Sequence, residues 1–219
     1  AIGNGALYNA TTGTYNVAVG NNSQYSVTTG SHNVSLGTQT LSANTGQRNT
    51  AVGHDALRYN TAANNNIAIG YYSSLYNTTG TANVAIGAQA LRENRTQSRN
   101  TAIGHQAMYF GNDSLTAANS NNTALGFYAL RGSTTAANNT GINNTALGAI
   151  AGNVITSGSR NTLVGQDAGG LLTTGSDNVA IGRSAANALT TGSTNIIIGS
   201  NIDVPAATTS NYLNIGDIL

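Results

Sequence analysis

Apolar and polar positions alternate in short runs along this chain, and each run ends at a glycine. In eleven repeats an Asn is followed by a β-branched residue, a small residue (twice an aliphatic one) and a large aliphatic residue, as in Asn83-Val84-Ala85-Ile86-Gly87. β-Branched residues favour extended backbone, and alternation with a period of two is typical of a strand. A helix is a poor interpretation, because the runs are short and are closed by glycine. The pattern therefore predicts one strand of five residues in each repeat.

The glycines that close these runs recur at a nearly fixed distance. Most successive glycines lie 17 residues apart, one pair lies 16 apart, and two adjacent pairs lie 22 apart. A fixed period in this range signals a solenoid, in which each coil buries its apolar face by stacking on its neighbours. The sequence thus predicts an all-β protein, a parallel β-solenoid of about twelve coils that forms a single elongated domain over residues 1–219. The glycines are Gly3, Gly20, Gly37, Gly53, Gly70, Gly87, Gly104, Gly126, Gly148, Gly165, Gly182, Gly199 and Gly216.

Alternation divides each strand between two faces. The β-branched and aliphatic columns share one face, and the Asn and Ala columns share the other. We expect the β-branched and aliphatic columns to be buried, and the Ala-rich face to let another chain pack closely. The alternative is a monomeric solenoid whose narrow interior requires Ala. We also expect each glycine to end its strand at a bend that needs positive φ or close backbone approach.

Three further columns complete the repeat. The Asn column has a structural explanation, because identical amides stacked at the ~4.8 Å strand spacing can bond along the stack or cap a turn; an Asn ladder that contacts a glycan is the sharper alternative. A second small residue three positions after the glycine, often followed by Leu as in Ala90-Leu91, predicts a second short strand or turn that adds one apolar side chain to the core. A Thr-Gly pair such as Thr79-Gly80 predicts a turn further on.

The two long periods each add five residues, and the frame resumes undisturbed after them. They predict loop insertions at residues 109–121 and 131–143, which bulge on the same side of adjacent coils. Residues 200–219 are expected to form a C-terminal transition segment. Because the chain begins within a repeat, at Ala1-Ile2-Gly3, we expect it to be part of a longer polypeptide.

The repeats resemble a known family. The strings Asn49-Thr-Ala-Val-Gly53-His-Asp-Ala56-Leu57 and Asn83-Val-Ala-Ile-Gly87-Ala-Gln-Ala90-Leu91 are similar to the head repeats of trimeric autotransporter adhesins, the YadA-like left-handed parallel β-roll. They also resemble repeats of phage-type tail fibre proteins that carry a C-terminal self-cleaving chaperone domain. The resemblance implies a left-handed β-roll, a homotrimer around one axis, and exposure at a cell or virion surface for attachment. The period here is longer than that of the compact adhesin repeat, and no stretch of residues 1–219 resembles the adhesin neck, coiled-coil stalk or membrane anchor.

Composition narrows the range of possible functions further. Charged residues make up 7% of the chain and the net charge is +1, so no basic field is available to attract nucleic acid. The chain has no Cys, which excludes disulfides and thiolate metal sites. It has no apolar stretch of about 18 residues, so we expect no direct membrane insertion. Little charge and much Asn, Thr, Ser and Gly fit an extracellular fibre better than a cytosolic enzyme.

The residue types that perform catalysis do not gather in the sequence. His54 and His105 occupy the same column three coils apart, roughly 14 Å at ~4.8 Å per coil, which is too far to share a metal. The acidic residues are scattered, and no pair is recognisable for glycoside hydrolysis. The glycines form no nucleotide-binding fingerprint. We therefore predict no enzymatic activity, no metal and no cofactor.

Aromatic residues gather in the middle coils beside the insertions. Tyr beside Asn and Ser suits stacking on sugars, and the alternative is that these rings cover Leu on a wet surface. We name seven of them as candidate partner-contact residues. They are Tyr71, Tyr72, Tyr76, Tyr109, Phe110, Phe127 and Tyr128.

Together these patterns favour a non-enzymatic structural and adhesive segment of an extracellular, cell-surface or virion fibre. Its partners would be its own copies, as a homotrimer, and a host-surface glycan or protein. Two alternatives stay open. An ice-binding solenoid would need an exposed, regular Thr array, and burial of the Thr, Val and Ile column argues against it. A glycan-degrading tail fibre would need carboxylates about 5 to 9 Å apart in a cleft between chains.

Overall fold

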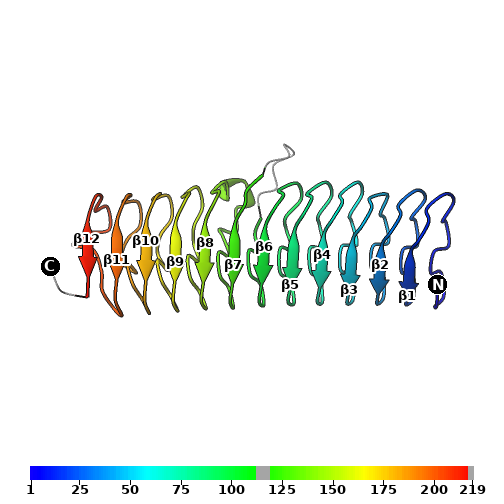
Figure 1. Ribbon diagram of the computed structural model, residues 1–219, viewed down its shortest axis with the longest axis horizontal. Helices are drawn as coiled ribbons and strands as arrows, with labels where there is room; N and C mark the ends of the chain where they lie inside the picture. The colour runs from blue at the N-terminus through cyan, green and yellow to red at the C-terminus, as the bar shows by residue number, and fades with distance from the viewer. Residues whose placement is uncertain (112–118, 217–219) are drawn as a thin grey trace.

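The computed structural model describes residues 1–111 and 119–216, and it shows the predicted parallel β-solenoid (Figure 1). Twelve strands form one sheet in chain order, and each pairs in parallel with the next. One 3₁₀ turn, η1 (Ala136–Asn138), is the only helical segment of the described residues. The strands are β1 (Val17–Val19), β2 (Val34–Leu36), β3 (Thr50–Val52), β4 (Ile67–Ile69), β5 (Val84–Ile86), β6 (Thr101–Ile103), β7 (Thr123–Leu125), β8 (Thr145–Leu147), β9 (Thr162–Val164), β10 (Val179–Ile181), β11 (Ile196–Ile198) and β12 (Leu213–Ile215).

The strands have three residues rather than the predicted five. The flanking Asn forms a side-chain ladder between coils, and the flanking Gly forms the bend after the strand. Register follows the repeat: Val84 pairs with Thr101 and Ile86 pairs with Ile103. The register stays in step across the 22-residue periods, where Thr123 pairs with Thr145. The inserted residues are therefore absorbed outside the sheet.

The prediction of which strand face is buried was wrong. The middle residue of each strand, such as Ala85 or Ala102, is fully buried inside the coil. The first and third residues point outward, and we call their side chains the outward face. Those that are most exposed retain between 37% and 52% of their accessible surface. They are Val17, Val34, Leu36, Ile67, Ile69, Leu125, Leu147, Ile181, Ile196, Leu213 and Ile215.

The width of the coil decides which column of strand residues fits inside it. The coil is filled by the strand Ala, the second small residue and the residue that follows it, for example Ala85, Ala90 and Leu91. The opposite walls are too close for two more large aliphatic columns. The narrow interior therefore favours Ala in this column, as the alternative interpretation held, and the larger Leu163 fits where Gly152 and Gly169 face it. The closely packed Ala-rich face between chains does not exist, because those Ala residues are enclosed within one chain.

The glycine column meets both conditions that were expected of it. Gly87 has a φ of +130°, and a Cβ added to it would lie 2.5 Å from the carbonyl oxygen of Gly104 in the next coil. The same contact, glycine to glycine, recurs along the stack. A side chain at this position would push adjacent coils apart.

The Asn column is a continuous buried ladder, so its structural explanation is confirmed. Asn66 Oδ1 accepts a hydrogen bond from the backbone N–H of Asn83 at 2.9 Å, and Asn66 Nδ2 donates to the Gly80 carbonyl at 2.9 Å. Asn83 repeats the pattern with Asn100 and Gln97. Each amide thus joins its own coil to the next and also caps the Thr-Gly turn. Because these side chains are buried, they do not form a glycan-contacting surface.

Other polar ladders were not predicted. Asn44, Asn60 and Asn77 stack inside the N-terminal half, with Asn77 Nδ2 donating to Asn60 Oδ1 at 2.9 Å. In the equivalent column of the C-terminal half the residues are apolar, as at Leu172 and Leu189. The same column can therefore hold amide side chains in one half of the solenoid and Leu in the other, provided that adjacent coils carry the same kind of side chain.

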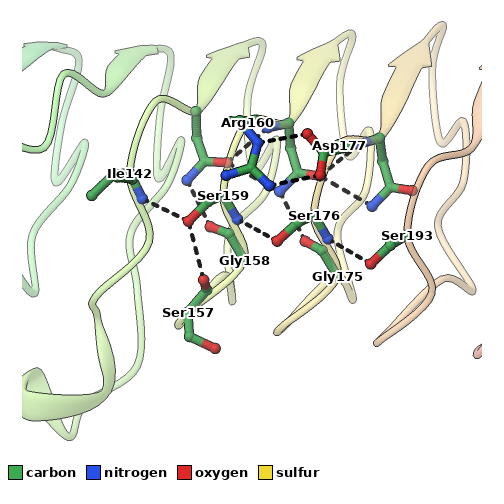
Figure 2. Close-up of polar contacts among 12 residues, drawn as sticks. Ile142, Ser157, Gly158, Ser159, Arg160, Gly175, Ser176, Asp177 and Ser193 are labelled. Carbon is green, nitrogen blue, oxygen red and sulfur yellow. Dashed lines mark hydrogen bonds and ion pairs between the residues drawn. The ribbon is translucent and has the colours of Figure 1, made fainter.

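A third ladder of hydroxyl groups runs along the C-terminal coils (Figure 2). The backbone N–H groups of Ile142, Ser159 and Ser176 donate to the hydroxyls of Ser159, Ser176 and Ser193, at 3.0 to 3.1 Å. Beside it Arg160 forms a two-pronged ion pair with Asp177, at 2.6 and 2.7 Å. These contacts link consecutive coils, so they stabilise the stacking of the solenoid.

The second small column leads into a turn rather than a second strand. Leu57 and Leu91 are buried there with φ of 51°, the left-handed region that L-residues rarely adopt. The turn delivers one apolar side chain per coil to the core, as expected.

The insertion at residues 131–143 lies at the loop edge of the solenoid, beside β7 and β8 (Figure 1). Residues 112–118 of the first insertion lie outside the described residues. The second, residues 131–143, contains η1. Its Asn139 donates to the Phe110 carbonyl at 2.7 Å and accepts from the N–H of Ser133 at 2.9 Å. The second loop is thus fastened to the start of the first.

Candidate functional site

Two near-identical aromatic groups lie immediately after the strands. In the first, Tyr71 stacks on Tyr72 with ring centres 3.9 Å apart, and His54 from the preceding coil lies 5.7 and 5.8 Å from them. In the second, the corresponding residues Phe127, Tyr128 and His105 give 3.9, 5.6 and 5.8 Å. The repeat therefore places the same constellation twice, because each residue stands at the same distance from its glycine.

A second set of rings lies further round the coil. Tyr59 and Tyr76 stack face to face, with centres 5.4 Å apart and planes parallel. Tyr109 meets Phe110 edge to face at 4.5 Å. Stacked and edge-to-face pairs are the favoured arrangements of aromatic rings. This set ends at Tyr109 and Phe110, where the first insertion begins.

Two arginines join these sets. The guanidinium of Arg92 lies 5.7, 5.2 and 5.5 Å from the rings of Tyr72, Tyr76 and Tyr109, and it donates a hydrogen bond of 2.7 Å to the Tyr109 hydroxyl. Such placement over ring faces is a cation–π interaction.

The guanidinium of Arg131 lies 5.7, 5.0 and 4.7 Å from the rings of Tyr109, Phe110 and Tyr128. It therefore continues the chain of contacts that Arg92 begins. All seven predicted partner-contact residues belong to one connected surface. We call it the Arg-aromatic band; it comprises Tyr59, Tyr71, Tyr72, Tyr76, Arg92, Tyr109, Phe110, Phe127, Tyr128 and Arg131.

Sequence reasoning missed the arginines of this band. Arg58, Arg92 and Arg131 each stand five residues after their glycine, so the column was visible in the sequence. The chain has eight cationic residues, and all are Arg. An Arg guanidinium stacks on rings more readily than a Lys ammonium does. Comparing the cation column with the aromatic columns would have revealed the band.

One buried carboxylate lies at the N-terminal end of the band. The Asp55 side chain is 4% exposed and lies 3.3 Å from His54 Nδ1 and 3.4 Å from the guanidinium of Arg58. A side-chain hydrogen bond with Tyr71 raises the pKa of Tyr72, and the negative charges of Tyr71 and Asp55 act in the same direction. The Tyr72 phenol therefore stays neutral at physiological pH and can donate a hydrogen bond.

The band does not contain the ligands of a metal site. In the described part of the chain, no group of three or more His, Asp and Glu residues could hold a metal ion. His54 and His105 each lie against rings of their own group, as single surface histidines would. Glu93 is paired with Arg92. What the band offers chemically is ring faces, guanidinium groups and hydroxyls.

No protein-family model, curated protein or solved structure matches this chain. Among residues 1–111 and 119–216, no helix has the length and apolarity needed to cross a lipid bilayer.

Proposed function

We propose that this chain is a non-enzymatic structural and adhesive segment of an extracellular fibre, carried by a cell or a virion. In this role the solenoid is a rigid spacer, and side chains on its loop edge attach to a partner surface. The observation that carries the proposal is the outward face, a strip of Val, Leu, Ile and Thr along all twelve strands. A strip of eleven spacings at ~4.8 Å is roughly 50 Å long, and contiguous apolar patches of that extent mark interaction sites.

The partner for the outward face is a second and a third copy of the same chain. A sheet of half-exposed aliphatic side chains offers no charged group and only the hydroxyls of its five Thr residues for hydrogen bonds, so it suits another largely apolar surface rather than a glycan. The repetition supports self-association, because identical columns can pack in the same way along the whole length. The number of three, the left-handed coil and the surface location come from the resemblance to adhesin-head and tail-fibre repeats.

Attachment would then be multivalent. Three copies of the Arg-aromatic band, held on one stiff frame, present the same weak contact three times. Linked weak contacts give an avidity well above the affinity of one contact. The partner in this proposal is a glycan or protein of a host surface.

The oligomeric state tests the proposal directly. Multi-angle light scattering of the intact chain should give three times the single-chain mass of 22.1 kDa. The double variant Ile69→Asp/Ile86→Asp places charge in the outward face and should give a monomer with the same circular dichroism spectrum. The control Leu171→Asp changes an exposed leucine outside the sheet and should stay trimeric. A monomeric wild-type chain would remove the main support.

One observation favours a second function, ice binding. Thr50, Thr101, Thr123, Thr145 and Thr162 lie in the first outward column, and four of them are on the consecutive strands β6 to β9. An ice-binding surface must be open to water, whereas the fibre proposal buries the same surface between chains. Thermal hysteresis together with a monomeric mass would support ice binding; a trimer without hysteresis would support the fibre.

A further inference from the structure

The outward face has two long edges, and both carry exposed side chains. We call the residue before each ladder Asn the first edge, and the residue after the glycine that follows each strand the second edge. At β10 these residues are Asp177 and Arg183, and both are exposed. Among residues 1–111 and 119–216, Asp177 is the only carboxylate on either edge and Arg183 is the only arginine on the second edge. Opposite charges therefore flank the same strand.

The two charges do not satisfy each other within one chain. Arg183 forms no ion pair in the described part of the chain. Asp177 receives one hydrogen bond on each carboxylate oxygen from Arg160, at 2.6 and 2.7 Å (Figure 2). An ionised carboxylate can accept about four hydrogen bonds, and the Asp177 side chain remains 42% exposed. Asp177 can therefore bind a second guanidinium that approaches from outside the chain.

Rotation about the long axis, the symmetry of the proposed trimer, brings the two edges together. A closed ring of copies has no shift along its axis, so each strand lies level with the same strand of the other copies. The ring is also head to tail, so the first edge of one copy lies beside the second edge of the next. Asp177 of each copy therefore comes to the same level as Arg183 of its neighbour.

The other arginines of the edges are compatible with this arrangement. Three lie on the first edge, and the second-edge residue at the level of each is a His or a Gln, so no two arginines meet. These levels are Arg48 with His54 at β3, Arg99 with His105 at β6, and Arg160 with Gln166 at β9.

We propose that Asp177 and Arg183 form a salt bridge between neighbouring copies, and that this pair fixes the register of the trimer. The inference rests on the proposed function, which supplies the trimer. The aliphatic columns repeat at every coil, so a shift by one coil would preserve the apolar contact and turn the closed ring into an open helix. Such a shift separates Asp177 from Arg183, and in one direction it places Arg160 beside Arg183. The edge charges therefore select the closed ring, because like charges across an interface suppress wrong arrangements.

A reversed pair of copies is the main competing arrangement. In a two-fold dimer of antiparallel solenoids that overlap fully, β10 comes level with β3 of the other copy. Asp177 would then face Arg48 rather than Arg183. Such a dimer has no place for a third copy on the same face, so it also differs from the proposed trimer in mass.

Site-directed cross-linking tests the contact, because the chain has no Cys of its own. The variant Asp177→Cys/Arg183→Cys, treated with a short bis-maleimide, should give a covalent trimer on a denaturing gel. In the matched control Asp177→Cys/Ala88→Cys, the second-edge position lies five coils away, roughly 24 Å at ~4.8 Å per coil, so this variant should remain a single chain. Asp177→Cys/Arg48→Cys should remain a single chain as well, whereas antiparallel copies would link it.

A change of charge provides a second measurement. Arg183→Glu places a like charge beside Asp177 and should raise the concentration at which half of the trimer dissociates by at least about tenfold. Arg95→Glu makes the same change of charge at an exposed position outside the two edges and should leave that concentration unchanged.

Three results would overturn the inference: no covalent trimer, linkage of either control pair, or equal effects of the two changes of charge. Light scattering on the same samples separates this failure from failure of the fibre proposal. A wild-type trimer whose Asp177→Cys/Arg183→Cys variant does not link would leave the fibre proposal standing, whereas a monomeric wild-type chain would remove both.

Discussion

At the scale of single residues, the Asn ladder and the glycine column set the stability of each coil. A buried Asn such as Asn66 satisfies a backbone donor of one neighbouring segment and a backbone acceptor of another. An unsatisfied buried polar group costs about 1–3 kcal/mol. These two columns therefore explain why the repeat allows so little variation at Asn and Gly, although neither residue has a side chain that fills the core.

Asn66→Ala should lower the free energy of unfolding by about 1–3 kcal/mol, because it leaves the Asn83 N–H without its partner and removes one of the two amide donors of the Gly80 carbonyl, the other being Asn77. Urea unfolding followed by circular dichroism measures the change. The control Asn21→Ala removes an exposed Asn and should cost less than about 0.5 kcal/mol. Equal losses for the two variants would contradict the role of the ladder.

The Arg160–Asp177 pair makes a prediction about pH. The hydrogen bond from Arg160 lowers the pKa of Asp177 below its ordinary value. Because the folded pKa lies below the unfolded one, the pair stabilises the fold above the unfolded pKa of about 3.9, and that contribution disappears as pH falls through the folded pKa. A carbon-13 carboxyl titration should show Asp177 with a lower midpoint than in Arg160→Gln. An unchanged midpoint in the variant would show that the pair does not form in solution.

At the scale of the strand, alternation predicts that there are two faces but not which face is buried. The sequence predicts two faces per strand correctly, because side-chain direction alternates whatever surrounds the strand. It does not say which face is enclosed, since that depends on the distance to the opposite wall of the coil. Ala85 is inside and Ile86 outside because the wall that carries Ala90 and Leu91 is close. Hydrophobicity alone ranks these columns in the wrong order.

The aromatic residues show a similar limit. Their clustering in the middle coils was visible, since Tyr71, Tyr72 and Tyr76 are close in sequence. The contacts that join them were not visible, because Arg92 reaches rings in the coils before and after its own.

Gly87→Ala tests the end of the strand. The variant must hold an L-residue at a φ of +130° and also place its Cβ against the Gly104 carbonyl, so the free energy of unfolding should fall by more than about 2 kcal/mol. Gly216→Ala is the control, because Gly216 has a φ of +55°, close to that of Leu57, and has no described atom within 4 Å of an added Cβ. Thermal unfolding should show a larger loss for Gly87→Ala; similar losses would mean that neither the φ of +130° nor the contact with Gly104 is costly.

At the scale of the whole molecule, stability is distributed along one axis. Each strand contacts only the strands before and after it, and the ladders of Asn, Ser and backbone groups likewise join neighbouring coils. In such a solenoid the total stability is approximately a sum of coil terms and nearest-neighbour terms. Stiffness along the axis follows, and the proposed spacer function depends on it.

A double-mutant cycle along the Asn ladder tests this description. Asn66 and Asn83 are in adjacent coils and are joined through the Asn83 N–H, whereas Asn178 is several coils away. Asn66→Ala with Asn178→Ala should be additive within about 0.5 kcal/mol. Asn66→Ala with Asn83→Ala should cost less than the sum by about 0.5–3 kcal/mol, because the first change loosens the backbone that positions the second amide. Urea unfolding of the three single and two double variants gives both coupling energies. Strong coupling between the distant pair would contradict the description of stability as coil terms plus nearest-neighbour terms.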